Sequence, residues 1–495
     1  MFERISPEQA GISSEAILNY IKTLEEYNLN THSLILARGN SIISETHYAP
    51  FCRDFKHRMY SVSKSFVGIA IGLLIDEGKM SLDDKFVSYF PEYVTDENCD
   101  AELAEMTIRD TLTMSTCQTA LGYWFYSNTD DRLKLYFHQP HKYYSQTIWE
   151  YDSPVSYMLG AIVERITGKP FLDYMKDRFL SDIGFSKDAY CVKCPGGHSF
   201  ADSGVMCTTY DLLLFARFVM NNGAWNGKQY MSEEYVKDAT SYLVANNHYG
   251  SVSYSSVGDG YQIWQSYDGG FCFLGMGDQL AICDGAHDFI MVITSDNQGN
   301  PHSRFLIFHD LYNNIIRKLS DKPLPENKQA YDALCKHEST RVLNFAKPMF
   351  DTSFGKEISG KTYTLYENPM KIEKFRIDFD DCGGTLYYTN ATGDKAIKFG
   401  YGHNEFQKFP EEGYSDMTAG KPCPGNKYEC AVSANFLEAK KLHIKVQAID
   451  KYFGILDMIF SFKDNRVTVK MEKTAEAFFD EYQGIAMGKC ELQFK

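Results

Sequence analysis

The spacing of the hydrophobic residues changes near residue 350, and this change divides the chain into two parts. Before it, long amphipathic or apolar stretches with helical spacing alternate with short strand-like runs such as 32–37, 41–46, 279–283 and 289–294. After residue 360 the pattern alternates with a period of two, as the apolar residues 375, 377 and 379 illustrate. The pattern therefore predicts a helix-rich α/β domain followed by an all-β domain.

The same pattern gives provisional domain limits. We expect an α/β (α+β) domain over 1–325, a linker over 326–349, and an all-β domain over 350–495 that forms a barrel or a curled sheet. The segment 321–326 contains two prolines and no periodicity, which is typical of a linker. In the first domain, strands at both ends and helices between them predict one antiparallel sheet flanked by helices.

Composition excludes several classes of partner. The chain has 495 residues, of which 44% are hydrophobic and 23% charged, as in ordinary globular proteins. Its net charge of −15 disfavours nucleic acid and anionic membranes as partners. We see no apolar window of membrane-spanning length and no secretory signal.

The number and spacing of the cysteines favour a reducing cellular compartment and disfavour a cysteine-bound metal site. The 13 cysteines are odd in number and scattered, which fits a reducing environment, so a cytoplasmic location is expected. One close pair, Cys191 and Cys194, has no second pair at matching spacing, so no metal site and no cofactor are expected.

A serine and a lysine three residues apart open the most apolar stretch of the chain. Ser61 and Lys64 begin a run that continues to Ile75 and is apolar on all sides, which predicts a buried helix. The spacing puts both side chains on one helix face, with the hydroxyl at the positive end of the helix dipole. Burying a lysine is costly unless it is paired or neutral, so the pair indicates chemistry. A capping serine beside a solvated lysine is the alternative.

The same spacing occurs again at Ser353 and Lys356. No apolar helix follows Ser353, which lies near the predicted domain junction. We therefore select Ser61 as the candidate nucleophile.

Two further segments could complete a site around Ser61. Tyr151 and Ser153 lie in a turn before a helical stretch, so both side chains can face one cleft. Gly275 and Gly277 flank Met276 just before a strand, where glycine lets the backbone approach a ligand closely. Each segment alone also fits an ordinary turn or bulge.

Taken in order, these segments resemble the serine β-lactamase-related family. The segments that carry the resemblance are 60–66, 78–84, 107–114, 151–153, 203–211 and 275–279, within about residues 5–320. The family contains class C β-lactamases, D-alanyl-D-alanine peptidases, esterases and amidases, and the chain looks closest to the branch of esterases and 6-aminohexanoate-dimer hydrolases. The resemblance implies a β-lactamase/transpeptidase-like fold, and family members often carry a C-terminal β-barrel.

The resemblance also implies roles for individual residues. Ser61 matches the nucleophile, Lys64 the lysine beside it, and Tyr151 the tyrosine of a Tyr-x-Asn motif in which Ser153 replaces Asn. The backbone N–H groups of Ser61 and Met276 would form the oxyanion hole. The serine proton would pass to the Lys64/Tyr151 pair, which titrates as one coupled unit, so neither residue is singled out as the base.

The third motif of the family departs from its usual form here. Lys-Thr-Gly or His-x-Gly is replaced by Gly275-Met276-Gly277, which lacks the cation that holds a substrate carboxylate. This replacement favours neutral esters or amides over penicillins and D-Ala-D-Ala peptides. A basic residue from elsewhere, such as Arg132, could restore the contact.

The expected function is therefore that of a serine hydrolase that acts on a small ester or amide through an acyl-enzyme. Tyr123 and Trp124 border the cleft on the family pattern and are candidates for contact with an apolar substrate, with core packing as the alternative. A second hypothesis is that the protein is a β-lactamase or a D-alanyl-D-alanine peptidase, because those enzymes use the same kind of serine nucleophile. A further hypothesis is a non-catalytic binding protein on a hydrolase scaffold, because the Gly275-Met276-Gly277 motif departs from the family form.

Overall fold

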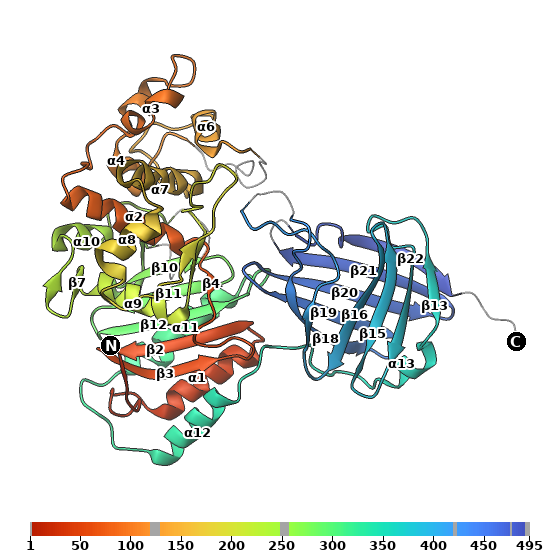
Figure 1. The fold of residues 1–495 in the computed structure, drawn as a ribbon. Coiled ribbons are helices and arrows are strands. Elements are labelled where there is room, and N and C mark those ends of the chain that lie inside the picture. The colour runs from red at the N-terminus through yellow and green to blue at the C-terminus, as the bar shows by residue number, and fades with distance from the viewer. Residues whose placement is uncertain (1, 119–128, 248–256, 419–422, 476–477, 491–495) are drawn as a thin grey trace, which may run out of the picture. The chain divides into compact units, whose positions relative to one another are not determined.

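The chain folds into two compact units. The computed structural model describes residues 2–118, 129–247, 257–418, 423–475 and 478–490. Unit 1 comprises Met1–Val342 with Met417–Gly420, and unit 2 comprises Leu343–Asp416 with Lys421–Lys495 (Figure 1). The boundary between Val342 and Leu343 lies inside the segment 326–349 that the sequence predicts as a linker. That segment contains a helix of unit 1, α12 (Lys328–Ser339).

One seven-stranded sheet runs through unit 1 in the order β1-β3-β2-β12-β11-β10-β9. Its strands, in that order, are Glu3–Arg4, Ser41–His47, Thr31–Arg38, Phe289–Ser295, Gln279–Asp284, Phe271–Gly275 and Trp264–Gln265. Neighbouring strands are antiparallel except β1, which runs parallel to β3. In the β2–β12 pair, Leu36 lies opposite Met291. The two ends of the unit therefore build one sheet, as predicted, with a short parallel strand added at its edge.

Helices cover both faces of this sheet because successive strand residues point to opposite sides. Leu34 and Leu36 of β2 face a core with α1 (Ser14–Glu26) and α11 (Ser303–Asn314). Ile35 and Ala37 face the other core, which contains α2 (Val62–Asp76), α7 (Ser153–Thr167) and α9 (Thr209–Met220) (Figure 1). The predicted α/β architecture, a sheet flanked by helices, is confirmed.

The remaining elements of unit 1 are short. The helices are η1 (Phe86–Tyr89), η2 (Pro91–Tyr93), α3 (Ala101–Glu105), α4 (Ile108–Leu112), α6 (Arg132–Phe137), α8 (Phe171–Met175), η3 (Lys176–Leu180), α10 (Glu233–Ala239), η4 (Tyr267–Gly269) and η5 (Ile316–Lys318). A three-stranded sheet joins β4 (His57–Arg58), β6 (Val205–Cys207) and β5 (Tyr190–Cys191), and β7 (Ala224–Trp225) pairs with β8 (Lys228–Gln229).

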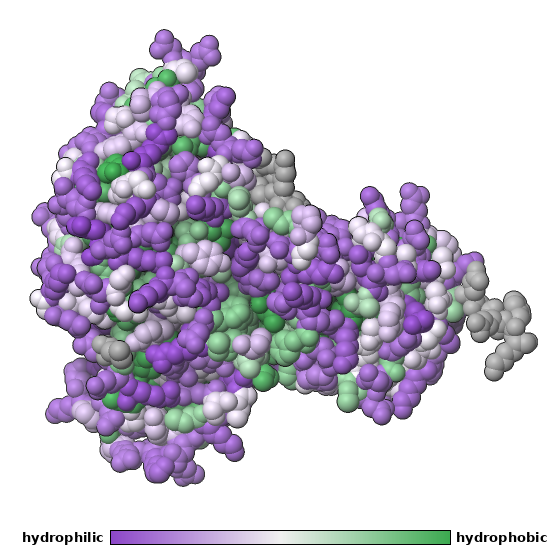
Figure 2. Space-filling view, in the orientation of Figure 1, coloured by the Kyte–Doolittle hydropathy of each residue, from purple (hydrophilic) through white to green (hydrophobic). Residues whose placement is uncertain are grey.

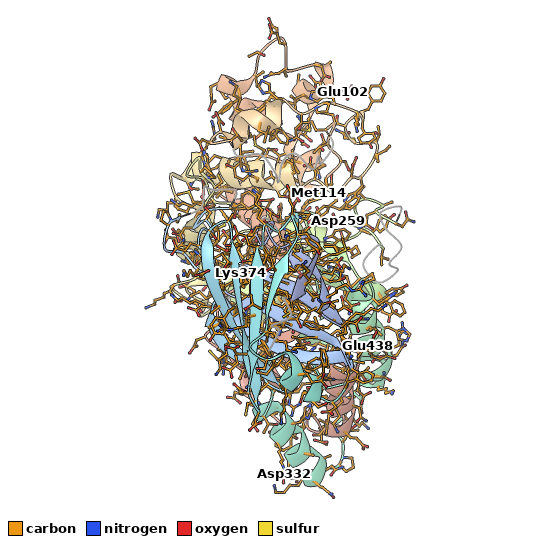
Figure 3. The ribbon with its side chains drawn as sticks, turned by 90° about the vertical axis from the view of Figure 1, so that its right-hand side faces the viewer. Glu102, Met114, Asp259, Asp332, Lys374 and Glu438 are labelled. Atoms are coloured by element: carbon orange, nitrogen blue, oxygen red, sulfur yellow. The ribbon has the colours of Figure 1, made fainter. Side chains whose placement is uncertain are left out.

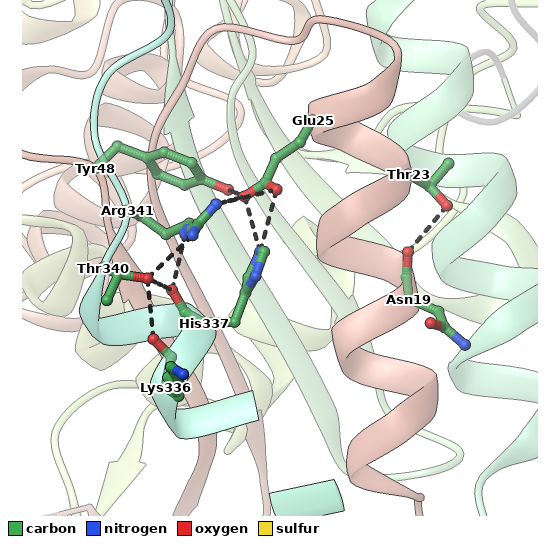
Figure 4. Close-up of polar contacts among 8 residues, drawn as sticks. All are labelled: Asn19, Thr23, Glu25, Tyr48, Lys336, His337, Thr340 and Arg341. Atoms are coloured by element: carbon green, nitrogen blue, oxygen red, sulfur yellow. Dashed lines mark hydrogen bonds and ion pairs between the residues drawn. The ribbon is translucent and has the colours of Figure 1, made fainter. Parts of the chain in front are cut away.

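A carboxylate of α1 attaches α12 to unit 1. Glu25 accepts hydrogen bonds from His337 Nε2 at 3.1 Å and from the Tyr48 hydroxyl at 2.9 Å. Arg341 Nη1 lies 3.4 Å from the same carboxylate (Figure 4). Because these partners come from separate stretches of the chain, the contacts hold residues 328–341 against α1.

A second carboxylate attaches the same helix to the edge of the sheet. Glu338 is buried, and its Oε1 accepts hydrogen bonds from Ser44 Oγ at 2.6 Å and from the backbone N–H of Glu45 at 3.2 Å. Its Oε2 pairs with Arg4. α12 is therefore a part of unit 1 and not a free connection.

Unit 2 is an all-β barrel. Its strands are β13 (Thr362–Leu365), β14 (Lys374–Phe379), β15 (Gly383–Asn390), β16 (Gly393–Tyr401), β17 (Glu405–Lys408), β18 (Glu429–Glu438), β19 (Lys441–Ile449), β20 (Phe453–Lys463), β21 (Arg466–Ala475) and β22 (Gly484–Cys490). They follow the order β16-β15-β14-β13-β22-β21-β20-β19-β18-β17, and an added β16–β18 pairing closes the ring. One short helix, α13 (Ser353–Ile358), precedes the strands. The predicted barrel-like domain is confirmed.

The surface in view is largely polar (Figure 2). The face of unit 1 in view is mostly hydrophilic, with scattered apolar side chains (Figure 2). Across the described residues, no helix combines the length and the hydropathy that crossing a membrane requires.

Candidate active site

The helix α2 presents Ser61 at its N-terminus. Ser61 occupies the N-cap position, and the residues from Val62 to Leu74 are all buried, as their apolar character predicts. The helix packs closely against its surroundings, since a Cβ on Gly68 would lie 2.6 Å from the carbonyl oxygen of Tyr261. The half-buried Ser61 hydroxyl thus lies where free N–H groups and the helix dipole favour negative charge.

A strained turn leads into this helix. Tyr60 has a φ of 48°, a conformation that costs a non-glycine residue about 1 kcal/mol. The turn is held on both sides: the N–H of Met59 donates to the carbonyl of Val205 at 2.8 Å, and the Arg58 guanidinium lies 4.5 Å from the Tyr60 ring centroid. The neighbouring strands β4 and β6 therefore fix the backbone that carries Ser61.

Lys64 lies at the centre of the site. Its side chain is only 3% exposed, and its Nζ donates to Ser61 Oγ at 3.1 Å and to the backbone carbonyl of Asp202 at 2.7 Å. The same Nζ lies 5.1 Å from the centroid of the Tyr151 ring. The structure thus brings the side chains of Ser61 and Tyr151, predicted from distant segments, to one lysine.

The segment after Tyr151 starts α7. The Asp152 carboxylate caps this helix: it accepts from the N–H of Val155 at 3.0 Å and from Thr116 Oγ1 at 2.9 Å. Burial raises the pKa of Asp152 to about 6, although these two hydrogen bonds and the Lys64 charge oppose the rise. Ser153 is the first residue of α7 and is buried. The Tyr-x-Ser segment therefore combines a predicted catalytic side chain with a buried helix cap.

Two tryptophans surround the Tyr151 ring. The ring centroids of Trp264 and Trp149 lie 5.7 Å and 6.3 Å from that of Tyr151. Trp149 is buried, and its Nε1 donates to Asp259 Oδ2 at 2.9 Å (Asp259 is labelled in Figure 3). Trp264 is partly exposed and belongs to the edge strand β9. Among the described residues, Trp264 is therefore a partly exposed aromatic residue beside Tyr151.

Sequence reasoning missed Trp264 because its proximity to Tyr151 arises from the pairing of β9 with β10, which no local pattern reveals. It selected Tyr123 and Trp124 instead. Both lie outside the described residues.

The end of β10 approaches the backbone just before Ser61. A Cβ at position 275 would lie 2.4 Å from the carbonyl oxygen of Met59, so only glycine fits at Gly275. Gly277 has a φ of 71° in the turn that follows Met276. Within the described part of the chain, no protein acceptor is hydrogen-bonded to the N–H of Ser61 or to that of Met276. Both donors are therefore available to a ligand.

A cation that the motif search did not find lies at this strand end. Arg304, in the first turn of α11, donates from Nη2 to the carbonyl of Gly275 at 3.3 Å and from Nε to Asp278 Oδ1 at 3.2 Å. Its charge is thus paired with that of Asp278. By contrast, Arg132 is buried, with its guanidinium 5.2 Å from the Phe200 ring centroid. Arg304 was missed because it follows the third motif by almost thirty residues.

A protein-family model covers most of unit 1. The beta-lactamase family model matches residues 19–309, more than half of the chain. The 6-aminohexanoate-dimer hydrolase of Paenarthrobacter ureafaciens is 24% identical over 254 residues, which are 47% of this chain. The match spans 63% of that relative's length, which is less than two thirds.

Solved structures show the same fold at low sequence identity. A Bacillus anthracis protein assigned as a 6-aminohexanoate-dimer hydrolase superposes with a TM-score of 0.53 and 19% identity, over 63% of this chain and 86% of that one. EstCE1, described as a hydrolase with promiscuous acyltransferase activity, gives a TM-score of 0.50 and 13% identity, over 60% and 99% of the two chains. At these sequence identities the comparison supports a shared fold and nothing beyond it.

Proposed function

The chain belongs to the beta-lactamase family, and from this premise we propose that it is a serine hydrolase that acts on small esters or amides through an acyl-enzyme. The observation that carries the proposal is the hydrogen bond of 3.1 Å from Lys64 Nζ to Ser61 Oγ, at the start of a buried helix. The names of its relatives, a 6-aminohexanoate-dimer hydrolase and the hydrolase EstCE1, support this class of substrate.

Ser61 is the nucleophile in this proposal. Its Oγ attacks the substrate carbonyl, and its proton passes to the Lys64/Tyr151 pair. The backbone N–H groups of Ser61 and Met276 donate to the oxyanion of the tetrahedral intermediate, as their free donors in the apo site allow. The C–O or C–N bond of the substrate then breaks, and the leaving group takes the proton from the pair.

Deacylation uses the same groups in reverse. The pair removes a proton from water, the resulting hydroxide attacks the acyl carbon, and the Ser61 oxygen recovers a proton as the acid product leaves. Lys64 is held by two acceptors and Tyr151 by aromatic neighbours, so both remain in place during the cycle.

The substrate-contacting groups follow from the same geometry. Gly275 and Gly277 let the end of β10 lie close to the acyl carbonyl, and Trp264 offers an apolar surface beside Tyr151. Ser153 at the start of α7 takes the position of the family asparagine as a polar contact. A neutral substrate fits best, because the charge of Arg304 is already paired with Asp278.

Activity-based labelling tests the proposal. A fluorophosphonate probe should label the wild-type protein on the peptide that contains Ser61, and the protein should hydrolyse p-nitrophenyl butyrate. Ser61→Ala should abolish labelling and lower kcat/KM by at least about 10³-fold.

The second Ser-x-x-Lys segment supplies a matched control. Ser353 and Lys356 are exposed in unit 2, so Ser353→Ala should retain wild-type labelling and turnover. Equal losses in the two variants, or hydrolysis that survives Ser61→Ala, would contradict the proposed nucleophile.

A further inference from the structure

The peptide group that carries the Met276 N–H lies just past the end of strand β10. In the β10–β11 ladder the last pair joins Gly275 and Gln279, so Met276 belongs to the turn that follows. A Cβ at position 275 would lie 2.4 Å from the carbonyl oxygen of Met59, which places the start of this turn beside the backbone that leads to Ser61. The sheet therefore brings the Met276 N–H to the site, whereas the direction of that N–H has to be set by other contacts.

A charged side chain from another element holds this peptide group. Arg304, in the first turn of α11, donates from Nη2 to the carbonyl oxygen of Gly275 at 3.3 Å. In a planar trans peptide, the carbonyl of one residue and the N–H of the next point in nearly opposite directions. The hydrogen bond to the Gly275 carbonyl therefore also sets the direction of the Met276 N–H.

The carboxylate of Asp278 keeps the arginine in place. Asp278 is buried, and its Oδ1 accepts from Arg304 Nε at 3.2 Å. Its Oδ2 accepts from Ser303 Oγ at 2.5 Å and from Asn297 Nδ2 at 3.2 Å. Because both oxygens have donors, the carboxylate is itself fixed, and it presents Arg304 to the Gly275 carbonyl from a defined position.

The peptide group on the other side of Met276 is held by Gln279. This side chain is buried, and its Nε2 donates to the carbonyl of Met276 at 3.0 Å and to that of Ser295 at 2.5 Å. Its Oε1 accepts from the N–H of Ser295 at 3.2 Å. Side chains thus restrain both peptide groups that meet at Met276. In the described part of the chain the N–H between them has no protein acceptor, which is the arrangement of a preorganised donor.

A second use of the Arg304 cation would be to bind a substrate carboxylate. Such a carboxylate would compete with Asp278 for the guanidinium, and its negative charge would lie beside that of Asp278. The hydrogen bond from Nη2 to the Gly275 carbonyl has no function in this alternative. The two contacts of Arg304 together therefore favour a role in the backbone of the site.

We propose that Arg304 is a positioning residue of the oxyanion hole: through the Gly275 carbonyl, it keeps the Met276 N–H directed at the oxyanion that forms when Ser61 attacks. The inference rests on the proposed function and names what orients one of the two oxyanion donors. Arg304 itself touches neither the substrate nor the reacting atoms.

The kinetics of Arg304→Ala test this role, because the change removes both hydrogen bonds of the guanidinium. Deleting an oxyanion donor outright costs about 10²–10³ in kcat, so the loss of its orientation should lower kcat for p-nitrophenyl butyrate by about 10- to 100-fold. Acylation and deacylation each form an oxyanion, so both steps should slow and KM should stay within about twofold.

A transition-state analogue gives a second readout. Butaneboronic acid forms a tetrahedral adduct with a serine nucleophile and places an oxygen in the oxyanion hole. Its affinity for Arg304→Ala should fall by about the same factor as kcat, since both depend on the Met276 donor.

Arg317→Ala is the matched control. Arg317 lies in η5, just after α11, and its Nη2 pairs with Asp268 Oδ2 at 3.2 Å on the exposed surface. The variant also loses a paired arginine, but one without a contact to the Gly275 carbonyl. It should keep the wild-type kcat, KM and affinity for butaneboronic acid.

The outcomes separate this inference from the proposed function. A folded Arg304→Ala protein with the wild-type kcat overturns the inference and leaves the hydrolase proposal intact. An increase in KM at constant kcat also overturns it, because the guanidinium would then contact the substrate. A lower kcat with unchanged affinity for butaneboronic acid overturns it as well.

Folding of the variant is covered by a second substitution. If Arg304→Ala does not fold, Arg304→Met, which keeps an unbranched side chain over the same surface, should show the same changes in kcat and affinity. If neither variant folds, Arg304 is structural and the inference is overturned. A wild-type protein that neither labels on Ser61 nor hydrolyses esters overturns the proposed function and this inference together.

Discussion

Two aspartates that cap helices, Asp152 and Asp131, differ in burial. Asp152 caps α7 from a buried position, where desolvation raises its pKa to about 6. Asp131 caps α6 in the same way, accepting from the N–H of Lys134 at 2.9 Å, but it is exposed to water. The pKa of Asp152 in the folded state lies above its unfolded value of ~3.8, so the ionised carboxylate destabilises the folded protein. The stability tied to Asp152 is present below pH ~3.8 and is lost as the pH rises through about 6.

We therefore predict that Asp152→Asn stabilises the protein increasingly as the pH rises. The amide still caps α7 but carries no buried charge. Its advantage in the free energy of unfolding should grow by about 2 kcal/mol between pH 4.5 and pH 8, measured by urea denaturation. Asp131→Asn, at an exposed helix cap, serves as the comparison variant. A constant difference for Asp152→Asn would mean that the carboxyl is not perturbed by burial.

The site residues that the sequence predicted are marked by local patterns or family motifs, whereas the residues that it missed are not. Ser61 and Lys64 are three positions apart on one helix, so their proximity follows from helix geometry. Tyr151 was a weak candidate from its turn before a helical stretch, and its role came from the order of the family motifs. Asp202, Trp264 and Arg304 approach the site through strand pairing and packing of remote segments, and nothing local marks them. Sequence alone therefore gave candidates for the reacting groups but not their electrostatic surroundings.

At the level of elements, the long periodic segments were predictable and the short or contact-dependent ones were not. The continuous apolar run of α2 and the alternating hydrophobic residues of the unit 2 strands can be recognised in the sequence. Two-residue β1 has no period, and its parallel pairing with β3 is a tertiary contact. α12 is polar on most of its surface, with only Leu334 and Glu338 buried, which made its segment resemble a linker. Ionic contacts of Glu25 and Glu338, beside the single buried apolar residue Leu334, attach it to unit 1.

We predict that one of those contacts dominates the attachment of α12. Glu338→Ala should lower the free energy of unfolding by about 2 kcal/mol, because Ser44 and Arg4 lose a buried charged partner. Asp332→Ala on the same helix removes only an exposed pair with Lys328 and should cost less than about 0.5 kcal/mol. Figure 3 shows Asp332 at the outer end of the helix. Denaturant titration of both variants measures the difference, and equal losses would argue against a structural role for Glu338.

On the scale of the whole molecule, the net charge and the altered third motif both disfavour anionic substrates. The chain carries a net charge of −15, which repels anionic substrates at low ionic strength. At the site, Arg304, which donates to the Gly275 carbonyl, is paired with Asp278 at 3.2 Å. A substrate carboxylate therefore meets long-range repulsion and then an arginine that is already paired. A neutral ester meets neither effect.

We accordingly predict that small neutral esters are turned over far better than penicillins or cephalosporins. An unpaired cation holds a carboxylate through a charge-assisted hydrogen bond typically worth about 1.5–3 kcal/mol. Without it, kcat/KM for carboxylate substrates should be lower by about 10- to 150-fold. Salt gives a second signature: kcat/KM for a chromogenic cephalosporin should rise between low and physiological ionic strength as repulsion is screened, while that for p-nitrophenyl butyrate should stay constant. Both substrates are measured with one preparation, with Ser61→Ala as the blank. A clear preference for the cephalosporin that disappears in Ser61→Ala would show that Arg304 binds the carboxylate despite Asp278, and the protein would then act as a β-lactamase.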